Sequence, residues 1–89
     1  MTSKEFIQRK IITKLYSLGK WNKNHLLIDN LESGFPVHCI KCIKKEVLQL
    51  IKEGILATKK SKHGLAVSLN IRRKEEIETI LNKELFFSL

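Results

Sequence analysis

The 89-residue sequence lacks the marks of several protein classes. No apolar run approaches the ~18–20 residues that a membrane-spanning helix needs. Two cysteines are too few for a disulfide-stabilised scaffold, and the N-terminal residues 1–5 lack the apolar core of a secretory signal. These absences predict a cytoplasmic protein with reduced thiols and no membrane partner.

Motifs for catalysis are also missing. The sequence has no glycine-rich phosphate loop, and no serine stands in a plausible His/Asp constellation. Glu75, Glu76 and Glu78 lie near the start of a predicted helix, where negative charge is favourable, so they need no catalytic explanation. We therefore expect no enzyme and no cofactor.

The spacing of the cysteines bears on whether the chain binds a metal ion. Cys39 and Cys42 form an isolated CxxC pair, and with His38 and His63 they could begin a zinc site, because zinc accepts two thiolates and two imidazoles. No second CxxC or HxxxH motif accompanies them, so we predict structural thiols and no metal site. A redox or metal role remains the alternative.

Acidic residues are scarce. Seventeen lysines and arginines face nine acidic residues, so the net charge is +8. Residues 37–64 hold seven lysines and two glutamates, which places +5 of this excess in one third of the chain. A chain of this length forms one domain over residues 1–89. The composition predicts a globular domain with a basic surface for a polyanion.

Hydrophobic spacing predicts the secondary structure. On the helix at 37–53 one face carries Ile40, Ile43, Val47, Leu50 and Ile51, and the other face collects polar residues and a thiol. Alternation at 65–70 predicts a half-buried strand, and His25 and Asp29 are spaced for a hydrogen bond within a helix. The predicted elements are helices at 4–18, 25–32, 37–53 and 72–87, strands at 55–60 and 65–70, helix-ending glycines at 19 and 54, a tight turn at 61–64 and a helix cap at Asn70.

The order of these elements resembles the winged helix-turn-helix family, in particular its small archaeal members. The resemblance covers nearly the whole chain and is most specific at Gly34-Phe35-Pro36, Glu53-Gly54-Ile55-Leu56 and Ser68-Leu69-Asn70. It implies an α+β, mostly α fold: a three-helix bundle with a helix-turn-helix, a β-hairpin wing and an extra C-terminal helix. It also implies a double-stranded DNA-binding transcriptional regulator, with helix 37–53 in the major groove and the wing at 55–70 on phosphates or in the minor groove.

DNA contacts are expected from the polar face of helix 37–53, from the wing and from the residues after it. Gln49 could bind adenine through two hydrogen bonds, whereas lysines more often contact phosphate. The alternatives are lysines that are merely solvated, a winged-helix protein–protein interaction module of a transcription, replication or RNA-processing complex, and binding of structured RNA. The expected contact residues are His38, Lys41, Lys45, Gln49, Lys52, Lys59, Lys60, Lys62, His63, Arg72 and Arg73.

The C-terminal residues are more apolar than a free end requires. Phe86 and Phe87 are neighbours, so on a helix they point ~100° apart and cannot both face the core. Phe6, Ile12 and Tyr16 form a second apolar flank on the first helix. Together these residues predict a homodimer interface; the alternative is a small core that wraps around the chain end.

Overall fold

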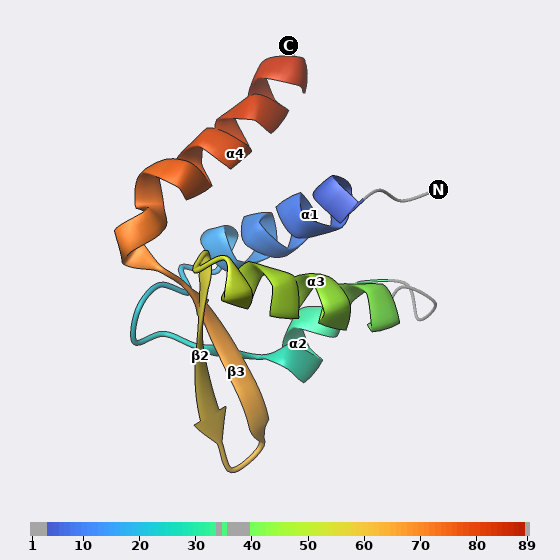
Figure 1. Cartoon of the computed structure of the whole chain (residues 1–89), viewed down its shortest axis with the longest axis vertical. Coiled ribbons are helices and arrows are strands. Elements are labelled where there is room, and N and C mark those ends of the chain that lie inside the picture. The colour runs from blue at the N-terminus through green and yellow to red at the C-terminus, as the bar shows by residue number, and fades with distance from the viewer. Residues whose placement is uncertain (1–3, 34, 36–39, 89) are drawn as a thin grey trace.

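A computed structural model describes residues 4–33, 35 and 40–88, with side chains up to residue 82. The fold is α+β and mostly helical, with one three-stranded antiparallel sheet (Figure 1). Within the described residues, no helix is long and apolar enough to cross a membrane. The elements are α1 (Lys4–Ser17), β1 (Leu26–Leu27), α2 (Ile28–Glu32), α3 (Ile40–Lys52), β2 (Leu56–Ser61), β3 (Gly64–Leu69), the 3₁₀ turn η2 (Ile71–Arg73) and α4 (Lys74–Ser88).

The hydrophobic core lies between α1, α3 and the sheet. Ile11 and Leu15 of α1, Ile43 and Val47 of α3, and Val67 of β3 are fully buried. Burying a side chain of this size stabilises the fold by ~1.5–3 kcal/mol. The inner side of α3 is therefore held firmly against the core, and its outer side is left to solvent.

Glycine ends α3 as the sequence predicts. The N–H of Gly54 donates to the carbonyl of Ile51, and the N–H of Ile55 donates to that of Leu50, both at 3.0 Å. These two bonds form a Schellman motif, which needs the left-handed conformation that Gly54 adopts at φ +83°. The same pair of bonds ends α1 at Gly19, so each helix stops sharply and the chain turns directly into the next segment.

The turn after α1 also changes one prediction. At helical spacing Leu18 follows Ile7, Ile11 and Leu15 on one apolar stripe, which predicts that it is buried, but it is 51% exposed. The helix ends at Ser17, and the turn at Gly19 directs Leu18 away from the core.

The segment 25–32 is not one helix, contrary to the prediction. Its first residues form β1, which pairs with β3, and α2 begins only at Ile28. Hydrogen bonds to a distant strand outweigh the local helical pattern, and a local pattern cannot reveal such a partner. His25 therefore precedes the helix, and its Nδ1 lies 3.2 Å from the carbonyl oxygen of Lys23 instead of bonding to Asp29.

The third strand also changes the burial of β3. The strand order is β1-β3-β2, so β3 lies in the centre of the sheet. The sequence predicts that Ala66 and Ser68 face solvent, yet they are 5% and 0% exposed. The Ser68 hydroxyl donates to the carbonyl of Asn22 at 3.2 Å, which shows that the loop before β1 covers this face.

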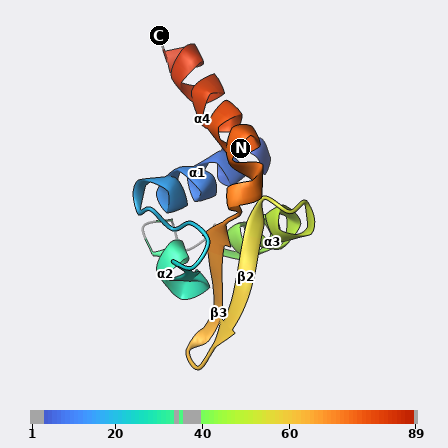
Figure 2. The same ribbon diagram turned by 90° about the vertical axis from the view of Figure 1, so that its left-hand side faces the viewer.

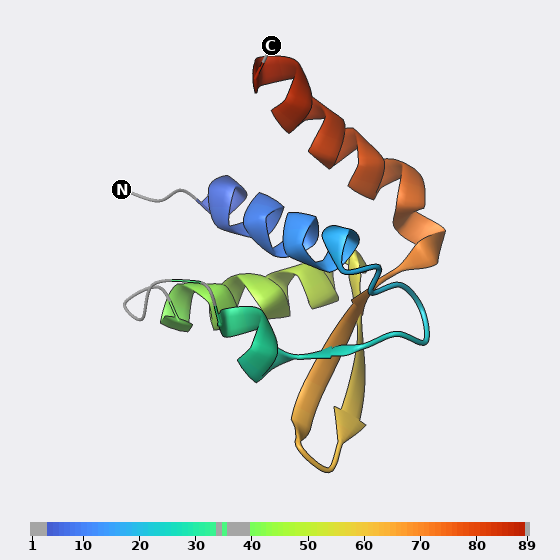
Figure 3. The same cartoon turned by 180° about the vertical axis from the view of Figure 1, so that it is seen from behind.

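The elements leave two ends of the molecule free. The β2–β3 hairpin extends past the helices at one end of the 42 Å long axis, and α4 rises away from α1 at the other end (Figures 1 and 3). From the side, α3 and β2 lie on one side of the molecule and α2 on the opposite side (Figure 2). The hairpin therefore adjoins α3 through β2, whereas β3 and the tip lie toward α2 (Figure 2).

Candidate nucleic-acid interface

The outer face of α3 carries three lysines in one line. Lys41, Lys45 and Lys52 are exposed, and at ~100° per residue they fall within ~40° of one another around the helix axis. Ile43 and Leu50, on the inner side, are 0% and 1% exposed. Because the inner side is fixed in the core, the three ammonium groups face solvent together.

The other α3 positions of the predicted interface are placed differently. Gln49 is half-buried at the side of the lysine line. Cys42 is an exposed free thiol, whereas His38 and Cys39 lie outside the described residues. In the part of the chain that the structure describes, no group of three or more His, Cys, Asp or Glu residues is placed to hold a metal ion.

Sequence reasoning missed Leu48, which lies within the lysine line. Its side chain is 60% exposed, although the other apolar residues of α3 are buried or half-buried. Leu48 stands three residues after Lys45 and four before Lys52, so it shares their face. That spacing could have identified it from the sequence.

Lys44 forms an ion pair within the fold. Its Nζ lies 3.8 Å from Oε1 of Glu32 on α2, whose side chain is only 11% exposed. That oxygen is buried and has no hydrogen bond within the described residues. The pair at this distance is electrostatic, and it joins α2 to α3.

A second unpredicted contact joins α3 to α1. Glu46 is 6% exposed on the inner side of α3, and its Oε1 accepts a hydrogen bond from Nε2 of Gln8 at 2.9 Å. A buried carboxylate without a partner is costly, so this bond favours one rotation of α3 about its axis. In that rotation the lysine line faces outward.

The tip of the hairpin extends the basic surface. Lys62 and His63 form the turn and are exposed, as the sequence predicts. The turn is closed by the hydroxyl of Ser61, which donates to the carbonyl of Gly64 at 2.8 Å and accepts from the N–H of His63 at 3.3 Å. These bonds hold the Lys62 and His63 side chains at the end of the molecule.

Lys59 and Lys60 lie on opposite faces of β2. Residues directly opposite in the ladder share a face, and Lys60 pairs with Leu65 while Thr58 pairs with Val67. Val67 is buried in the core, so Lys60 lies on the face that turns toward the helices, beyond the end of that core. Lys59 lies on the other face.

Arg72 and Arg73 form a separate part of the predicted interface. Both are exposed in η2, which follows the end of β3 farthest from the hairpin tip. The guanidinium of Arg73 is bound to Glu76 at 2.6 Å, and it packs beside Gly54 at the end of α3. Arg72 is therefore better placed than Arg73 to bind an external anion at the base of the hairpin.

Few carboxylates oppose this basic surface. The ion pairs among the described residues are Lys44–Glu32 and Arg73–Glu76. Within the same residues, the lysines of the outer face of α3 and of the hairpin have no acidic partner. The excess charge is thus available to an external anion.

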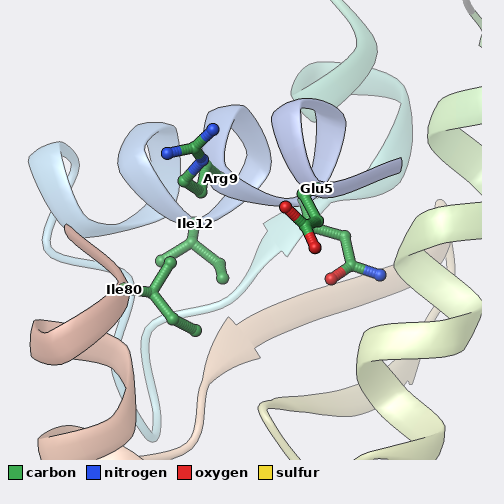
Figure 4. A pocket seen from close by; sticks show the side chains of 5 residues that line it. Glu5, Arg9, Ile12 and Ile80 are labelled. Atoms are coloured by element: carbon green, nitrogen blue, oxygen red, sulfur yellow. The ribbon is translucent and has the colours of Figure 1, made fainter. Parts of the chain in front are cut away.

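The predicted dimer surface requires one correction. Ile12 is 1% exposed and lies against Ile80 of α4, so it belongs to the contact between α1 and α4 (Figure 4). The two helices enclose a cleft of about 190 Å³ that is also lined by Glu5, Gln8 and Arg9. The sequence places Ile12 on an outer flank because it does not show how α4 covers that side.

The remaining dimer residues are only partly described. Phe6 and Tyr16 are 44% and 40% exposed on α1. The ring of Tyr16 packs edge-on against Trp21 at 5.7 Å between centroids, and its hydroxyl lies 3.5 Å from Oε2 of Glu78. The side chains of Phe86 and Phe87 lie outside the described residues.

Comparison with known proteins gives no relative. No protein-family model matches the chain, and no curated protein or solved structure matches it.

Proposed function

We propose that this chain binds double-stranded DNA, with the outer face of α3 in the major groove. The observation that carries the proposal is the line of Lys41, Lys45 and Lys52, which have no carboxylate partner among the described residues. The major groove is about 12 Å wide and admits one α-helix, and lysines at its edges can neutralise phosphates. A helix with a fixed apolar side and a free cationic side suits this role.

In this proposal the chain is a winged helix protein, and the β2–β3 hairpin is its wing. The β2 strand of the hairpin contacts α3, and these two elements lie on one side of the molecule (Figure 2). Lys60, Lys62 and His63 would bind flanking phosphates or enter the minor groove, and Arg72 would add a contact at the base. The protein would act in the cytoplasm as a transcriptional regulator, through binding alone.

The proposal includes a homodimer that forms through α1 and α4. Phe6 and Tyr16 expose apolar surface on α1, and α4 rises at the end of the molecule opposite the hairpin (Figure 1). A dimer built there would leave both α3 outer faces free. Two such faces would bind half-sites about 34–36 Å apart, one turn of the double helix.

The salt dependence of duplex binding tests the proposal. About six phosphate contacts predict a slope near −5 for log affinity against log salt. The variant Lys41→Ala/Lys45→Ala should bring the slope to near −3, since each phosphate contact contributes about one unit. The variant Lys4→Ala/Lys23→Ala loses the same charge from exposed sites outside the interface and should keep the wild-type slope.

Two results would contradict DNA binding. A duplex affinity that does not change with salt would exclude phosphate neutralisation as its source. Equal affinities of the wild type and the Lys41→Ala/Lys45→Ala variant would exclude the outer face of α3. The latter result would favour the protein–protein interaction module instead.

A further inference from the structure

Leu48 occupies an unusual position for an apolar side chain. It is 60% exposed, whereas Ile43, Val47 and Leu50 of the same helix are at most 1% exposed. It contributes nothing to the core, because it lies on the outer face of α3. An isolated exposed leucine needs no special explanation on most surfaces, but this one lies inside a cationic line.

The neighbours of Leu48 on the helix surface are cationic. Lys44, Lys45 and Lys52 stand four before, three before and four after it, at the spacings that bring side chains together on a helix. When phosphates draw the ammonium groups of Lys45 and Lys52 outward, the leucine between them is left uncovered. A DNA-bound α3 would therefore present one apolar group surrounded by charges.

The dimensions of α3 fit this arrangement to a groove. Lys41 and Lys52 are about 16 Å apart along the axis at 1.5 Å per residue, so a helix lying along the groove would bring its lysines to successive phosphates at the rims. Lysine side chains are longer than leucine and reach the phosphates at the rims. Leu48 lies between Lys45 and Lys52 along the helix, and in this placement it would face the floor of the groove, where the base edges are.

We propose that Leu48 contacts the 5-methyl groups of pyrimidines in the major groove, so that the protein prefers thymine-containing duplexes. This inference rests on the proposed DNA binding by α3. The 5-methyl group of thymine is the apolar group that a base pair presents in the major groove. Covering one methyl group by a leucine should tighten binding about three- to five-fold.

Four alternating duplexes isolate the methyl group as the variable. Poly(dA-dT) and poly(dA-dU) differ only by the 5-methyl group, and poly(dG-5-methyl-dC) and poly(dG-dC) differ by the same group at the same place in the groove. We expect the wild-type protein to bind the methylated member of each pair at least three-fold more tightly at one fixed salt concentration.

Two variants separate this inference from DNA binding itself. Leu48→Ala should bind both members of each pair equally, and it should keep the helix because Leu48 is exposed and alanine favours helices. Lys45→Ala should weaken binding to all four duplexes by a similar factor and keep the methyl preference, because phosphate contacts carry no sequence information.

Each outcome decides one of the two proposals. Methyl preference in the wild type that is lost in Leu48→Ala supports the inference. Equal binding of the two members of each pair by the wild type, or a methyl preference that survives in Leu48→Ala, overturns it while DNA binding stands. Absence of salt-dependent binding to any of the duplexes overturns the proposed function.

Discussion

The ammonium group of Lys14 stabilises the fold and is not part of the basic surface. Its ammonium group donates to the carbonyls of Asn30 and Leu31 at 3.2 Å each, and also to that of Ser33. These carbonyls lie at the end of α2, where helical carbonyls have no partners within the helix. The lysine also lies over the ring of Phe35 at 5.8 Å. Lys14 therefore fixes the end of α2 to α1.

We expect Lys14→Met to destabilise the protein by about 1–3 kcal/mol. Methionine keeps the apolar stem but removes the donors from three carbonyls, and hydrogen bonds to charged groups are worth about that much. Urea unfolding followed by circular dichroism measures the loss. Lys23→Met removes an exposed lysine and should change stability little. Equal stabilities of the two variants would contradict the role of Lys14.

The bond between Gln8 and Glu46 predicts strong coupling between these residues. Gln8→Leu leaves the buried carboxylate without this donor and should cost about 1–3 kcal/mol. Glu46→Leu in the same chain removes the carboxylate as well, so the double variant should be more stable than Gln8→Leu alone. A double variant whose loss equals the sum of the two single losses would exclude the coupling. Unfolding of the wild type and the three variants completes the cycle.

At the scale of elements, the sequence predicts those that depend on local patterns. α1, α3 and the hairpin follow from apolar spacing and from Gly19, Gly54 and the turn before Gly64, and all three are found where expected. The sequence misplaces β1 because its partner strand is distant in the chain. It misplaces Ile12 for a similar reason, since the cover on that side comes from α4.

In the candidate site, too, the features that depend on local spacing can be predicted and those that depend on packing cannot. Exposure of Lys41, Lys45 and Lys52 follows from the period of α3, and the structure confirms it. The commitment of Lys44 to Glu32 could not be predicted, because it depends on how α2 packs on α3. Leu48 could have been found, since its position on the face is a matter of spacing alone.

The register of the hairpin strands predicts different roles for two neighbouring lysines. Lys60 lies on the face that turns toward the helices, and Lys59 lies on the other face. We expect Lys60→Gln to weaken duplex binding several-fold more than Lys59→Gln, because only Lys60 shares the side of α3. Fluorescence anisotropy with a labelled duplex measures both. A larger effect of Lys59→Gln would place the DNA on the opposite face of the hairpin.

At the scale of the whole molecule, the basic surface and the proposed dimer surface lie apart. The hairpin tip and the far end of α4 lie at opposite ends of the 42 Å axis (Figure 1). Self-association through α4 would therefore not cover the outer face of α3. This separation allows each surface to be tested without disturbing the other.

We expect Phe86→Ser/Phe87→Ser to convert a dimer into a monomer. Two adjacent phenylalanines on a helix cannot both face one neighbour, and serine removes the apolar area that a second copy would cover. Light scattering after size exclusion should give twice 10.4 kDa for the wild type and 10.4 kDa for the variant. Leu48→Ala lies on the other surface and should keep the wild-type mass. A wild-type mass of 10.4 kDa would contradict the dimer.

The position of β2 has a consequence for solubility. β2 lies at the edge of the sheet, and among the described residues no strand pairs with the side that faces away from β3. Such an edge can join the sheet of a second molecule, and charged side chains are a common means of preventing it. Lys59 and Lys60 stand on this edge, where their mutual repulsion across two copies would oppose pairing. The same charges that we propose attract phosphate would thus oppose edge-to-edge pairing of free molecules, and we expect hairpin variants with fewer charges to aggregate more readily.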